Sequence, residues 1–198
     1  ITCSTFSGKA VCRLVWDMNK AENDAYLEKT MAGIPENFSG KLLEVPVGTG
    51  ILTMPLYQTL PQADITCLDY SSDMMGQAQE KAERLHLENV TFRQGDVGAL
   101  PFADGAFDIV LSLNGFHAFP DKEAAYREVF RVLKSGGTFL ICNECSGDNA
   151  EDEKWTEKVS EMIIYKDVQL KAILEQAGFH DIQIHKNEKG WLCILARK

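Results

Sequence analysis

The stretch at residues 42–50, which reads LLEVPVGTG, constrains the fold of this chain more than any other part of the sequence. Its first half is nearly all apolar, which is typical of a strand buried on both faces of a parallel sheet. Gly48 and Gly50 follow directly, and residues without a Cβ atom can take positive φ angles and let a ligand approach the backbone closely. A helix that begins near Ile51 would direct its free N–H groups toward the same place. The stretch therefore predicts a strand, a ligand-binding turn and a helix in succession.

A second strand is expected at residues 64–69, and Asp69 lies at its carboxyl end. In a nucleotide-binding βαβ unit, an acid roughly 20 residues beyond the glycine turn accepts hydrogen bonds from ribose hydroxyls. Gly48, Gly50 and Asp69 together predict a site for a ligand with an adenosine-like end.

Strands and helices alternate along the rest of the chain. We expect helices at residues 20–31, 53–60, 72–85, 121–133 and 167–178, and strands at residues 41–47, 64–69, 89–93, 107–113, 138–142, 182–185 and 192–196. This alternation predicts a doubly wound α/β fold, in which helices cover both faces of an open, mostly parallel, seven-stranded sheet. The short connection at residues 186–190 predicts an antiparallel C-terminal hairpin. Right-handed crossovers would bring the carboxyl ends of the parallel strands to one edge.

Composition limits the kinds of protein to which this chain can belong. A length of 198 residues suits one domain, residues 1–198, with its own core. The net charge of −9 argues against nucleic acid as the main partner, because such proteins usually carry a basic patch. We expect no membrane span, because no apolar run approaches the ~18 residues that a span needs. We expect no signal peptide, because residues 1–16 lack a basic stretch followed by an apolar core. The six cysteines are scattered, which favours a reducing cytoplasm.

Three kinds of nucleotide site are candidates for the glycine turn. A phosphate-binding loop needs glycine, four residues and then Gly-Lys-Ser/Thr, and Gly40-Lys41 does not fit because Leu42 follows it. A dinucleotide site needs a third glycine, and Thr53 stands in its place, which disfavours an oxidoreductase. The third candidate ligand is S-adenosylmethionine, which has an adenosine and an amino-acid tail but no phosphate.

The motifs in order resemble those of the class I S-adenosylmethionine-dependent methyltransferases, in the broad group that includes the quinone-biosynthesis C-methyltransferases. The resemblance covers roughly residues 41–145. The family pattern E/D-x-G-x-G-x-G falls on residues 44–50, its acid after the second strand on Asp69, and its Gly-Asp-Ala/Val on residues 95–97. Leu-Pro-Phe and Phe-Asp-x-Val fall on residues 100–102 and 107–110, and the helix and turn before the fifth strand on residues 127–137.

The resemblance implies a Rossmann-like fold, S-adenosyl-L-methionine as cofactor, S-adenosyl-L-homocysteine as product, and a small-molecule methyl acceptor. It also implies cofactor contacts at the carboxyl ends of the strands. Glu44 would orient the turn or hold the methionine amino group, and Asp69 would accept from both ribose hydroxyls. Asp96 would accept from the adenine amino group, and Asn114 would lie near the methionine portion. The implied cofactor-binding residues are Glu44, Pro46, Gly48, Gly50, Asp69, Tyr70, Met74, Gly95, Asp96, Val97 and Asn114.

Pro46 is a departure, because it replaces the first glycine of the pattern. Proline fixes φ and removes a backbone donor, so a stiffer turn is expected. We also expect residues 1–35 to form a helical cover and residues 146–166 to form a loop and helix on the acceptor side. Trp16 or Tyr26 would either pack this cover onto the domain or lie over the ligand.

His117 is the candidate general base, because it follows the fourth strand on the expected active edge and a neutral imidazole can accept a proton near pH 7. The alternative is a histidine that only packs its loop, since many methyl transfers need no base. The acceptor pocket or the core could hold Phe116, Phe119, Trp155, Met162 and Tyr165. The single pair Cys142-x-x-Cys145 predicts no metal site. A non-catalytic S-adenosylmethionine-binding protein, a sensor or a partner subunit, is the alternative function.

Overall fold

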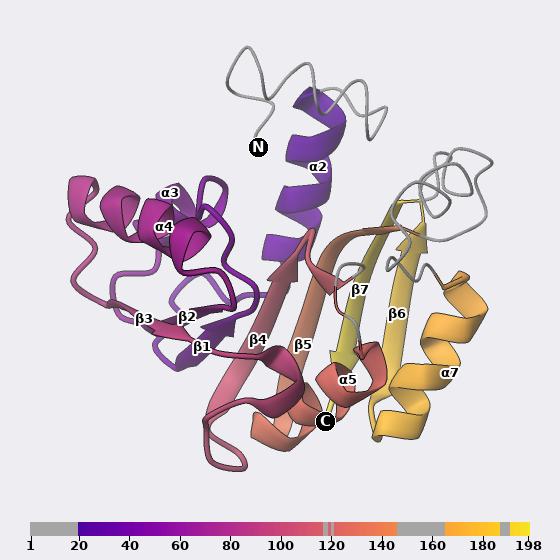
Figure 1. Cartoon of the computed structure of the whole chain (residues 1–198). Helices are drawn as coiled ribbons and strands as arrows, with labels where there is room; N and C mark the ends of the chain where they lie inside the picture. The colour runs from indigo at the N-terminus through magenta and orange to yellow at the C-terminus, as the bar shows by residue number, and fades with distance from the viewer. Residues whose placement is uncertain (1–19, 117–118, 120, 146–164, 187–190) are drawn as a thin grey trace.

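The computed structural model describes residues 20–116, 119, 121–145, 165–186 and 191–198 (Figure 1). The helices are α2 (Lys20–Met31), α3 (Thr53–Tyr57), α4 (Ser72–Arg84), α5 (Lys122–Val132), α7 (Asp167–Ala177) and the short 3₁₀ helix η1 (Val97–Ala99). The strands are β1 (Lys41–Glu44), β2 (Asp64–Asp69), β3 (Val90–Gln94), β4 (Phe107–Leu113), β5 (Leu133–Cys145), β6 (His180–Lys186) and β7 (Trp191–Arg197).

The strands form one seven-stranded sheet in the order β3-β2-β1-β4-β5-β7-β6. The strands from β3 to β5 in this order pair in parallel, whereas β7 is antiparallel to both β5 and β6. The predicted fold is therefore confirmed, including its antiparallel C-terminal hairpin. The chain order reverses between β1 and β4, and open α/β sheets bind ligands beside the carboxyl ends of the strands at such a point.

Each face of the sheet has its own hydrophobic core. Helices α5 and α7 pack against one face, where Tyr126, Leu174 and Phe139 are buried together. Helices α3 and α4 cover the other face, where Tyr57, Ile65 and Ala78 are buried. Figure 1 shows α3 and α4 on one side of the sheet and α5 and α7 on the other. Two covered faces explain why the central parallel strands β1 and β4 carry nearly continuous apolar runs.

Three elements differ in length from those expected. Strand β1 ends at Glu44 rather than at residue 47, because Pro46 has no N–H to continue the ladder. Helix α3 ends at Tyr57, and turn bonds such as that from the Leu60 N–H to the Tyr57 carbonyl (3.1 Å) follow it. Strand β5 begins at Leu133, and the turn expected at residues 135–137 is present as an irregularity between two of its pairs with β4.

The helix ends follow the chemistry of their sequences. The Ser71 hydroxyl accepts from the Met74 N–H at 3.3 Å, and the Asp121 carboxylate accepts from the Ala124 N–H at 2.8 Å. Gly178 ends α7 with a φ of 107°. These three caps confirm the predicted helix boundaries. Within the described part of the chain, every helix is too short or too polar to cross a lipid bilayer.

An ion pair on α5 holds the loop before β4. The Arg131 guanidinium donates to the Glu128 carboxylate and to the carbonyls of Leu100 and Phe102, with distances of 2.8–2.9 Å. The same carboxylate accepts from the Leu100 N–H at 2.7 Å, and its bond with Arg131 holds the Glu128 pKa below the ordinary value. The side chains of Arg131 and Glu128 therefore connect the helix before β5 to the backbone of the Leu-Pro-Phe motif.

Candidate functional site

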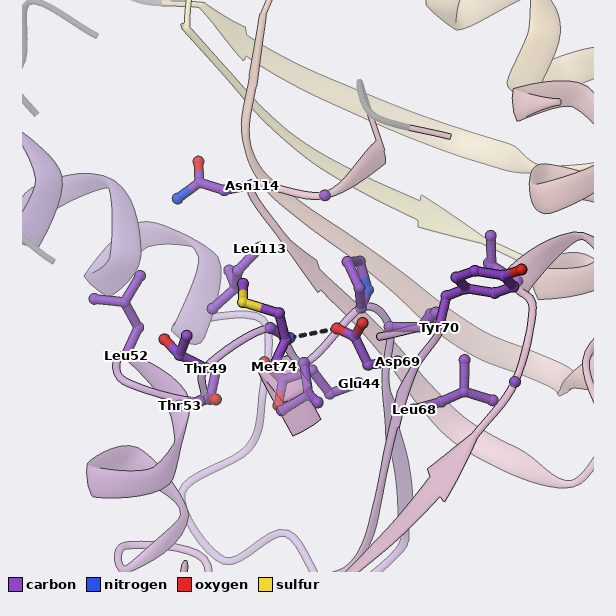
Figure 2. A pocket seen from close by; sticks show the side chains of 18 of the residues that line it. Glu44, Thr49, Leu52, Thr53, Leu68, Asp69, Tyr70, Met74, Leu113 and Asn114 are labelled. Carbon is purple, nitrogen blue, oxygen red and sulfur yellow. Dashed lines mark hydrogen bonds between the residues drawn. The ribbon is translucent and has the colours of Figure 1, made fainter. Parts of the chain in front are cut away.

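A cleft of about 780 Å³ lies where β1, β2 and β4 reach their carboxyl ends (Figure 2). The turn after β1 forms one wall, and the segments after β2, β3 and β4 form the rest. The structure brings all the cofactor-binding residues implied by the resemblance to this cleft. They are Glu44, Pro46, Gly48, Gly50, Asp69, Tyr70, Met74, Gly95, Asp96, Val97 and Asn114.

The two glycines of the turn have different surroundings. Both have positive φ, 55° at Gly48 and 61° at Gly50. A Cβ atom at Gly50 would lie 2.8 Å from the Ala78 Cβ and 2.9 Å from the Met54 Cγ, so Gly50 lets α4 pack against the start of α3. A Cβ at Gly48 would approach only the Met74 Cε, at 3.9 Å. Gly48 therefore leaves open space at the wall of the cleft.

Asp69 holds this turn in place. Its Oδ2 accepts from the Gly48 N–H at 2.7 Å, the bond drawn in Figure 2, and its Oδ1 accepts from the Ser71 N–H at 2.8 Å. The residue is 6% exposed. A carboxylate offers about four lone-pair sites, so each oxygen can accept one hydrogen bond more. The arrangement suits a ligand with two neighbouring hydroxyls.

Glu44 lies beneath the turn and is nearly inaccessible to solvent. Its Oε2 accepts from the Tyr57 hydroxyl at 2.8 Å and from the Cys67 thiol at 3.5 Å. Burial raises the pKa of the Glu44 carboxyl to about 8, although the donors around it, Tyr57 foremost, act in the opposite direction. Burial also raises the pKa values of Tyr57 and Cys67. At pH 7 the cluster is therefore largely neutral.

The other end of the cleft is more open. Tyr70 is 78% exposed and Met74 40% exposed, which makes them the exposed apolar rim of the cleft. Asp96 caps η1 through its Oδ1, which accepts from the Gly98 N–H at 2.8 Å, and Val97 is buried beside it. The Asp96 Oδ2 is not used by this cap. Asp96 therefore has the turn-capping role and can still accept from a ligand.

The segment after β4 completes the cleft. Asn114 has a φ of 55° and donates its N–H to the Cys142 carbonyl at 3.0 Å. The cleft is also lined by four residues that no sequence motif marks as site residues, Ile51, Leu52, Leu68 and Leu113. Leu68 and Leu113 at strand ends, and Ile51 and Leu52 just before α3, look like core in a sequence, so no local signal separates them from buried neighbours. Phe119, a candidate for the acceptor pocket, lines the cleft as well.

The remaining candidates lie apart from the cleft or outside the described residues. Phe116 is a core residue, because it is fully buried and stacked on Tyr126 with ring centroids 4.6 Å apart. Tyr165 packs against the core beside the Lys122 ammonium. The Cys142 thiol is buried 3.8 Å from that of Cys193. His117, Trp16, Trp155 and Met162 lie outside the described residues, as do residues 1–19 and 146–164, and the described part of the chain does not extend to the side chains of Tyr26 and Cys145.

Comparisons with known proteins agree with the resemblance that the sequence motifs carry. Residues 39–190 match the model of a family described as "Methyltransferase domain". The demethylmenaquinone methyltransferase of Thermus thermophilus is 41% identical over 101 residues, which are 51% of this chain and 46% of the relative. The enzyme of that name from Lactococcus lactis is 34% identical over 126 residues, 63% of this chain and 50% of the relative. The chain spans about half the length of these curated relatives.

A solved structure resembles the fold along the whole chain. The phosphoethanolamine N-methyltransferase 2 of Haemonchus contortus, in complex with phosphomonomethylethanolamine and S-adenosylhomocysteine, superposes with a TM-score of 0.78. The match covers 100% of this chain and 59% of that chain at 17% identity, so it shows the fold alone. The sheet order, the glycine turn with its acid, and the family match lead to one conclusion: the chain belongs to the methyltransferase-domain family.

Proposed function

We propose that the protein binds S-adenosyl-L-methionine in this cleft and transfers its methyl group to a small-molecule acceptor, leaving S-adenosyl-L-homocysteine. The observation that carries the proposal is the position of Asp69. Its carboxylate fixes the glycine turn through the Gly48 N–H and retains acceptor sites for two ribose hydroxyls. Family membership and the methyltransferase names of the curated relatives support the same reaction.

The residues of the cleft fit this cofactor. A volume of about 780 Å³ lies within the range of roughly 300–1,000 Å³ that is usual for small-molecule sites. Gly48 leaves space along the turn, and Asp96 offers an acceptor for an adenine amino group. Tyr70 and Met74 are exposed at the rim. If they covered an adenine ring, their apolar surface would be removed from contact with water, which favours binding.

When bound, S-adenosylmethionine supplies a methyl group that is already activated by the positive sulfur. The protein then has to position an acceptor in line and to exclude water. Leu52, Leu113 and Phe119 provide apolar walls for this purpose near Asn114. For acceptors that need a base, we propose His117 as that base, because it follows closely after Asn114 in the sequence.

The apolar walls also support a class of acceptor. We propose a small molecule with an apolar body, which agrees with the demethylmenaquinone that the names of the relatives give as their substrate. We place the reaction in the cytoplasm. Among the described residues, the buried thiol of Cys67 is free, which supports a reducing compartment.

Calorimetry with S-adenosylhomocysteine tests the binding proposal. Asp69→Ala should weaken binding by about 1.5–3 kcal/mol, the usual value of a hydrogen bond to a charged group. Asp69→Asn should lose less, because the amide oxygen still accepts one hydrogen bond. Asp73→Ala is the control, because Asp73 is an exposed acid on α4 that does not line the cleft. Equal affinities of the wild type and Asp69→Ala would contradict the proposal.

Turnover requires a second experiment. The protein is incubated with methyl-labelled S-adenosylmethionine and a panel of small acceptors, demethylated quinones among them. We expect release of S-adenosylhomocysteine that depends on one acceptor class. Binding without release across the panel would favour the non-catalytic S-adenosylmethionine-binding protein instead.

A further inference from the structure

Pro46 stands where the glycine pattern of the family has its first glycine, and its ring lines the cleft. The two residues that flank Pro46 form backbone hydrogen bonds with two different strands. The Val45 N–H donates to the Leu111 carbonyl on β4, and the Val47 N–H donates to the Leu68 carbonyl on β2, each at 2.9 Å. The ring is therefore held in place between the ends of two strands.

Gly115 lies directly against this ring. A Cβ atom at Gly115 would lie 2.1 Å from the Pro46 Cδ and 2.5 Å from its Cγ. Carbon atoms in contact are about 3.5–4.0 Å apart, so the two groups cannot share this space. A proline ring cannot swing aside as the end of a long side chain can. The chain has room for the ring at position 46 or for a side chain at position 115, but not for both.

The residues around Gly115 are also fixed. Asn114 on one side donates its N–H to the Cys142 carbonyl at 3.0 Å. Phe116 on the other side is buried in the aromatic core against Tyr126 and Phe139. Gly115 is therefore the point at which an anchored loop meets the turn after β1. Both Asn114 and Gly115 line the cleft.

We propose that Pro46 is a positioning residue of the cleft. Its ring, packed on Gly115, sets the distance between the turn after β1 and the loop after β4, and with it the width of the cleft beside Asn114. The proposal rests on the proposed function, because it treats the cleft as the cofactor site. It predicts that positions 46 and 115 are coupled in ligand binding.

A double-mutant cycle tests the coupling by calorimetry with S-adenosylhomocysteine as the probe. Gly115→Ala should weaken binding by about tenfold or more, because the new methyl group displaces the ring and the turn. Pro46→Gly should weaken binding by about threefold through the looser turn. The double variant should bind within about threefold of Pro46→Gly, because removing the ring makes room for the methyl group. Losses that simply multiply in the double variant would overturn the proposal.

Controls separate positioning from stability. Leu174→Ala lowers stability in the core away from the cleft and should leave the affinity unchanged. Gly76→Ala is the matched glycine control, because a Cβ there has no atom within 4 Å. Urea midpoints of the four cycle proteins should show the same coupling. A wild type that binds no S-adenosylhomocysteine would refute the proposed function, whereas additive midpoints would refute the contact between Pro46 and Gly115.

Discussion

Glu44 is an acid that the fold keeps away from water. The sequence predicts its place in β1, but not that its carboxyl is largely neutral at pH 7. That state depends on Tyr57 from α3 and Cys67 from β2, which are distant in the sequence and meet the carboxyl only in the folded protein. Asp69 shows the opposite case, because an acid at a strand end beside a glycine turn can be recognised from spacing alone.

The stability of the protein should therefore depend on Glu44 in a particular direction. The folded state holds the proton up to a pKa of about 8, whereas the ordinary value is 4.5. The folded state thus binds more protons than the unfolded state over this window, and the free energy of unfolding falls as pH rises through it, by about 1.4 kcal/mol per pKa unit of difference. Glu44→Gln should flatten this slope in urea unfolding between about pH 5 and about pH 8. The exposed Glu36→Gln should keep it, and parallel slopes for wild type and Glu44→Gln would contradict the assignment.

At the scale of elements, the types and order of helices and strands could be predicted, but some of their ends could not. The end of β1 depends on Pro46. The sequence shows that this residue has no N–H, but only the structure shows that the N–H groups of Val45 and Val47 still bond to β4 and β2. The sequence predicts the start of β5 five residues late (138 instead of 133), because a glycine turn resembles a break between elements. In the structure it is an irregularity within the strand.

The turn between β1 and α3 should respond differently to alanine at its two glycines. Gly50→Ala should cost several kcal/mol of stability, because positive φ is strained for alanine and the Cβ would overlap Ala78 and Met54. Gly48→Ala should cost roughly 1 kcal/mol from the positive φ alone, and should act mainly on S-adenosylhomocysteine affinity. Urea unfolding and calorimetry measure the two effects. Equal losses of stability would show that the packing of Gly50 against α4 does not matter.

At the scale of the whole molecule, one sheet joins two cores. Because the strands are shared by both faces, we expect a single unfolding transition rather than two. Ile65→Ala in one core and Leu174→Ala in the other should each cost about 2–5 kcal/mol and should shift the same transition. Circular dichroism and intrinsic fluorescence should coincide during the urea titration. Val168→Ala, at a 76% exposed position, should change the midpoint little, and two separate transitions would contradict the expectation.

The outermost strands of this sheet, β3 and β6, lie at opposite ends of it (Figure 1). Both present polar groups to solvent, among them Arg93 on β3 and Asp181, His185 and Lys186 on β6. Charged side chains on an edge discourage a foreign strand from adding to the ladder. Such charged edge strands therefore disfavour edge-to-edge association of sheets, and with it the formation of fibrils, at the high protein concentration of a cell.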